Sequence, residues 1–138
     1  MSSITNFGPL KAKLLCYGGT SVCCPDYDED LPKIMERGVL TQGLPSKLMV
    51  GEPNQCHANA CNLYESNLAA GIDVRIWTGY AISSDGIWRQ HSWLKHYYTS
   101  RNGRKLEELV ETTKRRLLYF GFELTPEEAD EFCYNNYY

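Results

Sequence analysis

Three residues that lie far apart in the sequence have the side chains needed for thiol chemistry: Cys56, His91 and Glu111. A cysteine nucleophile needs a base to take its proton, and the base needs an acceptor that orients it. Cys56 follows a Gly-Glu-Pro-Asn-Gln turn and opens a predicted helix. The positive end of a helix and its unpaired backbone N–H groups favour the thiolate form of a cysteine. The chemistry that these residues predict is attack of a thiolate on an amide or ester carbonyl.

The helix that must position Cys56 is predicted to run from Cys56 to about Ala70, with Gly71 just past its end. Its apolar side chains follow helical spacing and form one stripe: Ala60, Leu63, Tyr64 and Leu68. Cys56 precedes Ala60 by four positions and Leu63 by seven, so it belongs to the same face. We therefore expect Cys56 to point toward the sheet on which the helix packs.

His91 and Glu111 fall on predicted strands. Residues 73–83 and 87–96 are rich in β-branched and aromatic side chains and flank a Ser-Asp-Gly turn, which indicates a β-hairpin. A third strand is predicted within residues 106–113, at its Val-Glu-Thr-Thr end. If the second and third strands pair, His91 and Glu111 become cross-strand neighbours.

An oxyanion that develops on the substrate would need hydrogen-bond donors beside the thiol. Gln55 precedes Cys56 directly, so its amide and the Cys56 backbone N–H are the candidate donors. We assign Asn54 and Trp93 to the residues that shape this site.

The order of these motifs resembles the transglutaminase-like branch of the papain-like cysteine hydrolases. That branch commonly shows a His-Ala-Trp segment followed by Asp-Pro-Thr on the next strand; here the chain has His91-Ser92-Trp93 and Glu111-Thr112-Thr113. The likeness covers about residues 51–115. Glutamate replaces the usual aspartate, and His57 replaces the usual tryptophan after the cysteine. The resemblance implies a papain-like core, in which the helix carrying the cysteine packs on an antiparallel sheet, and a peptide-like amide substrate without a cofactor.

The rest of the chain completes an α+β layout in one domain. Residues 1–50 form an irregular covering segment of loops and short strands, with one short helix near Leu31–Met35, and residues 51–115 form the catalytic-type core. Residues 116–138 form a C-terminal extension. Thr125-Pro126-Glu127-Glu128 in it is a capping box that predicts a helix from Pro126 to about Asn135.

Composition excludes several classes of function. The 138 residues include 14 basic and 17 acidic side chains, a net charge of −3, with no long basic run for nucleic acid or anionic lipid. Neither a secretory signal nor a spanning apolar segment is visible, so we expect a cytoplasmic protein. In that reducing compartment we interpret the cysteines other than Cys56 as packing residues, and we expect no metal. A zinc site would have to combine Cys16, Cys23, Cys24, Cys61, His57 and His96, whose spacing matches no zinc motif.

Each assigned residue also has an ordinary structural role open to it. Cys56 could be a packing residue, His91 a strand histidine among tryptophans, and Glu111 a surface carboxylate paired with Lys114 or Arg115. His57 competes with His91 as the base, although adjacent residues on a helix point about 100° apart. The alternative function is a non-catalytic binding or inhibitory module on the same fold, or a zinc-stabilised domain.

Overall fold

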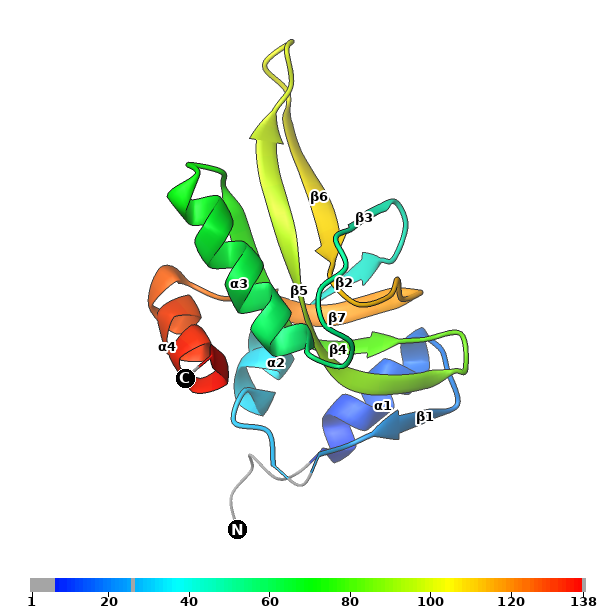
Figure 1. Ribbon diagram of the computed structural model, residues 1–138. Coiled ribbons are helices and arrows are strands. Elements are labelled where there is room, and N and C mark those ends of the chain that lie inside the picture. The colour runs from blue at the N-terminus through cyan, green and yellow to red at the C-terminus, as the bar shows by residue number, and fades with distance from the viewer. Residues whose placement is uncertain (1–6, 26, 138) are drawn as a thin grey trace. The chain divides into compact units, whose positions relative to one another are not determined.

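The computed structural model describes residues 7–25 and 27–137, which form a mixed α+β fold (Figure 1). Within these residues there are four helices: α1 (Gly8–Tyr17), α2 (Leu31–Arg37), α3 (Cys56–Ala69) and α4 (Pro126–Tyr137). The strands are β1 (Ser21–Cys23), β2 (Val39–Gln42), β3 (Ser46–Leu48), β4 (Val74–Ile82), β5 (Ile87–Thr99), β6 (Lys105–Glu111) and β7 (Leu118–Glu123). The predicted α+β class is confirmed.

The strands pair in the order β2-β7-β4-β5-β6-β3, and β1 pairs with β5. The β1–β5 and β3–β6 pairs are parallel, whereas β2–β7 and β5–β6 are antiparallel. The sheet is therefore mixed. The strands on either side of the Ser-Asp-Gly turn are neighbours in it, as the predicted hairpin requires.

The chain divides into two compact units. Unit 1 comprises the chain up to Gly43 together with Thr78–His91 and Arg116–Phe122, and unit 2 comprises Leu44–Trp77, Ser92–Arg115 and Glu123–Tyr138. Strands β4 and β5 contribute residues to both units. The boundary in β5 falls between His91 and Ser92.

Unit 1 contains a helix that the sequence analysis missed. Residues 8–17 were expected to be loop, but they form α1, which buries Leu10 and Leu14 four positions apart. Gly8-Pro9 and Gly18-Gly19 mark the two limits of this helix, because proline fits the first helical positions and Gly18 follows the last one. The expected helix near residues 31–35 is confirmed as α2.

Unit 2 packs α3 against α4 and carries the pairing of β5 with β6. The predicted limits of α3 are confirmed, and Gly71 just beyond it has a positive φ of 76°. Ala60 and Tyr64 of its stripe are buried, but Leu68 was wrongly predicted to pack, since 59% of it is exposed. The capping box of α4 is confirmed: Thr125 N–H donates to Glu128 Oε1 (2.9 Å), and Glu128 N–H donates to Thr125 Oγ1 (3.2 Å).

Candidate functional site

Cys56 is the first residue of α3, as the sequence predicted, and its side chain is half-buried. Asn54 has a φ of +60°, which reverses the chain just before the helix, and both Asn54 and Gln55 are exposed. The Asn59 N–H donates to the Gln55 carbonyl (2.8 Å), so the helical hydrogen bonding begins at Gln55. The Cys56 thiol therefore lies where the helix dipole favours an anion.

The segment that leads into Cys56 is fixed to the end of β6. Met49 N–H donates to the Glu111 carbonyl and Gly51 N–H donates to the Thr112 carbonyl, both at 2.8 Å. These bonds extend the parallel pairing of β3 with β6, in which Leu48 lies opposite Glu111. The candidate nucleophile and the candidate orienting carboxylate thus belong to segments that are hydrogen-bonded to one another within unit 2.

Asn59 of α3 fixes the turn that precedes Cys56. This residue was not among those predicted for the site. Its Oδ1 accepts from Glu52 N–H (3.0 Å) and its Nδ2 donates to the Glu52 carbonyl (2.8 Å), with only 7% of the residue exposed. A Cβ on Gly51 would lie 2.5 Å from the Asn59 carboxamide, so any larger residue there would displace that side chain. The signal available in the sequence was an asparagine one helical turn after Cys56 and a glycine before the turn.

Glu111 is fully buried, so the alternative of a surface carboxylate is wrong. Its Oε2 accepts three hydrogen bonds, from the backbone N–H of Thr112 (2.9 Å), the N–H of Thr113 (2.9 Å) and Thr113 Oγ1 (3.0 Å). The Glu-Thr-Thr segment therefore orients its own carboxylate. Arg115, one of the ion-pair partners considered for Glu111, instead donates to Ser46 Oγ (3.2 Å).

His91 lies in β5 with 2% of its surface exposed, in unit 1. Its carbonyl accepts from Thr78 Oγ1 (3.4 Å), and its ring faces Tyr119, with ring centroids 6.1 Å apart. Cys56 and Glu111 belong to unit 2, so the grouping of the three side chains stays a prediction. In the β5–β6 register Leu94 lies opposite Val110. One further step of that register would place Trp93 opposite Glu111.

His57 connects the first turn of α3 to β5. Its Nδ1 lies 2.6 Å from Ser92 Oγ, and its ring meets Phe132 of α4 edge-on, with centroids 5.5 Å apart. Ser92 is fully buried and follows His91 directly. The residue directly after Cys56 therefore makes a specific polar contact with Ser92 of β5.

Trp93, which was assigned to the site, is a fully buried core residue of unit 2. Its ring stacks on Trp77, with centroids 6.5 Å apart, and the Lys95 ammonium lies 4.0 Å from the centroid of the Trp77 ring. Trp93 can therefore support the site by packing. His96 stacks on Tyr98, with centroids 5.0 Å apart.

The remaining cysteines differ in environment more than the sequence suggested. Cys16, Cys23 and Cys24 are exposed, so the expectation that they are packing residues is wrong. Cys61 and Cys133 are buried between α3 and α4, and the hydrogen bond between their side chains, together with burial, raises the pKa of Cys61. Across residues 7–25 and 27–137, no cluster of three or more His, Cys, Asp or Glu side chains is arranged to hold a metal.

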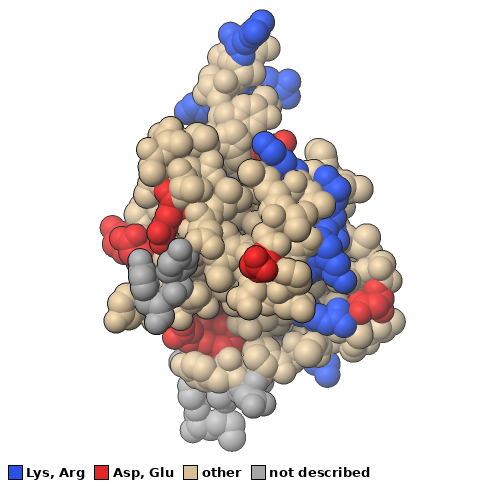
Figure 2. Space-filling view, in the orientation of Figure 1, with Lys and Arg blue, Asp and Glu red and all other residues tan. Residues whose placement is uncertain are grey.

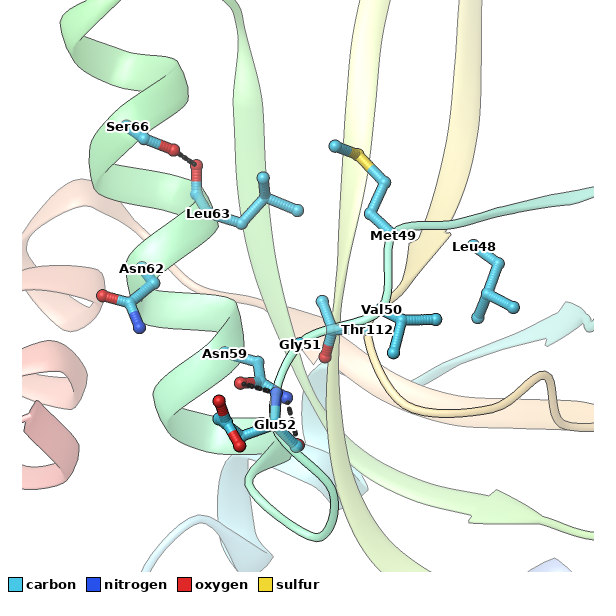
Figure 3. A pocket seen from close by; sticks show the side chains of 10 residues that line it. All are labelled: Leu48, Met49, Val50, Gly51, Glu52, Asn59, Asn62, Leu63, Ser66 and Thr112. Atoms are coloured by element: carbon cyan, nitrogen blue, oxygen red, sulfur yellow. Dashed lines mark hydrogen bonds between the residues drawn. The ribbon is translucent and has the colours of Figure 1, made fainter.

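An open groove of about 790 Å³ lies beside α3, in unit 2 (Figure 3). Its walls come from the segment after β3, from α3 and from the end of β6: Leu48, Met49, Val50, Gly51, Glu52, Asn59, Asn62, Leu63, Ser66 and Thr112. The groove therefore runs beside α3, the helix that begins at Cys56.

The face drawn in Figure 2 carries both basic and acidic side chains, with broad uncharged surface between them. None of the described helices is long and apolar enough to cross a membrane.

Comparisons of this chain with known protein families, with curated proteins and with solved structures give no match in any of the three.

Proposed function

We propose that this protein is a thiol-dependent acyl-transfer enzyme on a papain-like, transglutaminase-like core. Cys56 is its nucleophile, His91 its general base and acid, and Glu111 the carboxylate that orients the imidazole. The observation that carries the proposal is the pair of backbone hydrogen bonds, Met49 N–H to the Glu111 carbonyl and Gly51 N–H to the Thr112 carbonyl, because they join the segment before Cys56 to the backbone of the residue whose carboxylate is buried.

The reaction proceeds in two halves. His91 takes the proton of the Cys56 thiol, and the thiolate adds to the carbonyl carbon of an amide or ester. The Gln55 amide and the Cys56 backbone N–H donate to the resulting oxyanion. As the C–N or C–O bond breaks, the imidazolium gives its proton to the leaving amine or alcohol. Water or an amine then attacks the thioester, loses its proton to His91, and the thiolate leaves.

Two further features support this assignment. Three donors hold Glu111 Oε2 in one orientation, as a carboxylate that fixes an imidazole tautomer requires. His57, the residue after Cys56, is hydrogen-bonded to Ser92, the residue after His91.

The test is alkylation of the native protein with iodoacetamide at pH 6, with each modified thiol located by mass spectrometry. The exposed Cys16 and Cys23 provide internal references, because both are accessible to the reagent and neither belongs to the proposed site. We expect Cys56 to react at least roughly tenfold faster than either, since an activated cysteine is largely thiolate there. The proposal fails if Cys56 reacts no faster, and the non-catalytic binding module then becomes the better description.

Two variants identify the base. In His91→Ala the rapid reaction of Cys56 should disappear, whereas His57→Ala should retain most of it. If only His57→Ala abolishes the reaction, the base is His57, with Ser92 as its hydrogen-bond partner, and the assignment of His91 is overturned.

A further inference from the structure

The groove beside α3 has two walls whose apolar side chains converge. Leu63 extends from the helix toward the segment after β3, and Met49 extends from that segment toward the helix (Figure 3). Leu63 is half-buried and 41% of Met49 is exposed. Apolar side chains that face each other across an open groove can contact an aliphatic side chain of a ligand.

The groove also favours a neutral ligand over an acidic one. Of the ten residues that line it, Glu52 alone carries a charge; the others are apolar or are uncharged side chains such as Asn62 and Ser66. Amide and hydroxyl side chains can hydrogen-bond a peptide backbone, whereas an acidic ligand would meet the Glu52 carboxylate.

A buried hydroxyl in the wall points independently to a ligand. Thr112 is 1% exposed and lines the groove, and within the described part of the chain its Oγ1 has no hydrogen-bond partner. A buried polar group that lacks a partner costs free energy, and a ligand that bonds to it would recover that cost.

Two residues that line the groove share a face of α3 with Cys56. Asn59 and Leu63 follow Cys56 by three and seven positions, so all three lie on one face of α3. Seven residues of helix rise about 10 Å, which is the length of about three residues of extended peptide. In a peptide whose reacting carbonyl is at Cys56, the residue that bears this carbonyl counts as the first. The side chain of the third residue, counted toward the N-terminus, would then lie near Leu63 and Met49.

We infer that this groove binds the acyl-side segment of a peptide substrate, with an aliphatic side chain at the third residue before the carbonyl that Cys56 attacks. The inference rests on the proposed function for the position of the reacting carbonyl. A site on the acyl side keeps the substrate anchored through both halves of the reaction, because the acyl group stays attached to Cys56.

The first experiment compares two thiol-reactive peptides, acetyl-Leu-Gly-Gly-chloromethyl ketone and acetyl-Asp-Gly-Gly-chloromethyl ketone. Cys56 Sγ displaces chloride from either, forming a thioether. The leucyl probe should modify Cys56 roughly tenfold faster than the aspartyl probe, the size of effect that a filled apolar subsite gives. Leu63→Ala should remove most of this preference. Leu68→Ala is the matched control, since Leu68 is on the same helix, is 59% exposed and does not line the groove. Equal rates in the wild type, or a preference unchanged in Leu63→Ala, would overturn the inference.

The second experiment measures binding without the chemistry. Acetyl-Leu-Gly-Gly-amide is titrated into Cys56→Ala protein labelled at its methionine methyl groups. The Met49 resonance should shift, while Met35 in α2, which belongs to unit 1, should not. A shift at Met49 together with ordinary reactivity of Cys56 toward iodoacetamide would reject the enzyme and keep the groove as a peptide site. Reactive Cys56 with no Met49 shift would reject the groove and keep the enzyme. A Met49 shift that follows protein concentration alone would identify a second copy of the chain as the occupant and overturn the inference.

Discussion

Two carboxylates are buried among the described residues, Asp28 in unit 1 and Glu111 in unit 2, and they are held in different ways. Asp28 accepts from Asp30 N–H at Oδ1 (2.9 Å) and from the Tyr80 hydroxyl at Oδ2 (2.9 Å). Glu111 Oε2 accepts from the next two residues. Asp28 thus joins the approach to α2 to β4, 52 positions away, whereas the end of β6 builds the orientation of Glu111 locally.

This difference separates a carboxylate that stabilises the fold from one that we propose is positioned for chemistry. A buried carboxylate that joins distant segments affects the free energy of unfolding first. One whose orientation is fixed by its own strand end can act on a neighbour with a smaller effect on folding.

Asp28→Asn should lower the free energy of unfolding by about 2–3 kcal/mol, because hydrogen bonds to a buried charged group are replaced by weaker and partly mismatched ones. Urea denaturation measures the change. The rate at which iodoacetamide modifies Cys56, relative to Cys16, should stay the same in the folded variant. A large loss of Cys56 reactivity with little loss of stability would reverse the roles assigned to the two carboxylates.

Glu111→Gln should show the opposite pattern. The relative rate of Cys56 modification should fall by roughly tenfold or more, equivalent to about 1.4 kcal/mol per factor of ten, because a glutamine cannot stabilise an imidazolium as a carboxylate does. The loss of unfolding free energy should be smaller than in Asp28→Asn. Unchanged reactivity of Cys56 would remove Glu111 from the site.

Asn59→Ala should loosen the turn before Cys56 without touching either carboxylate. Losing the two hydrogen bonds to Glu52 should cost about 1–2 kcal/mol of stability and lower Cys56 reactivity several-fold. Asn62→Ala is the control on the same helix, since Asn62 is exposed. Similar effects of the two substitutions would show that the turn does not depend on Asn59.

Alkaline pH should weaken the fold through Tyr80. Burial, followed by the charge and hydrogen bond of Asp28, raises the pKa of Tyr80, and burial raises that of Tyr97 beside Glu123. A tyrosine titrates near pH 10 in the unfolded chain, so above that pH the unfolded state binds fewer protons than the folded state. Stability is therefore complete below about pH 10 and falls above it, by up to about 1.4 kcal/mol per pH unit for each tyrosine.

Denaturation at pH 9 and at pH 11 measures this slope, and Tyr80→Phe should reduce it while leaving the contribution of Tyr97. An identical slope in Tyr80→Phe would show that the Asp28–Tyr80 contact has no part in the alkaline loss of stability.

The parts of the fold that were predicted correctly have signals within a few residues of one another. Helix α3 has its apolar spacing and a glycine past its end, and α4 has a capping box whose two reciprocal hydrogen bonds are present. Helix α1 lies in the segment predicted to be loops and short strands, although its limits, Gly8-Pro9 and Gly18, are as local. Leu68 was wrongly placed in the core, since helical spacing gives the direction of a side chain but not how far the neighbouring structure extends.

The candidate site shows the same division. Cys56 at a helix start follows from the sequence, because a turn and an apolar period determine where a helix begins. The burial of Glu111 does not, since a glutamate before Thr-Thr and three basic residues has the composition of a surface strand end. Its burial depends on β3 and the segment after it lying alongside the end of β6.

Local backbone preferences and the period of apolar side chains were enough to predict the helix that begins at Cys56 and the β-hairpin that contains His91. The residue types that thiol chemistry needs can be identified directly in the sequence. Tertiary structure decided which backbone groups join the turn at Met49–Glu52 to β6 and to Asn59, and which groove lies beside them. These contacts pair segments that are distant in sequence, and no local pattern specifies which hydrogen-bonding groups will meet when such segments pack.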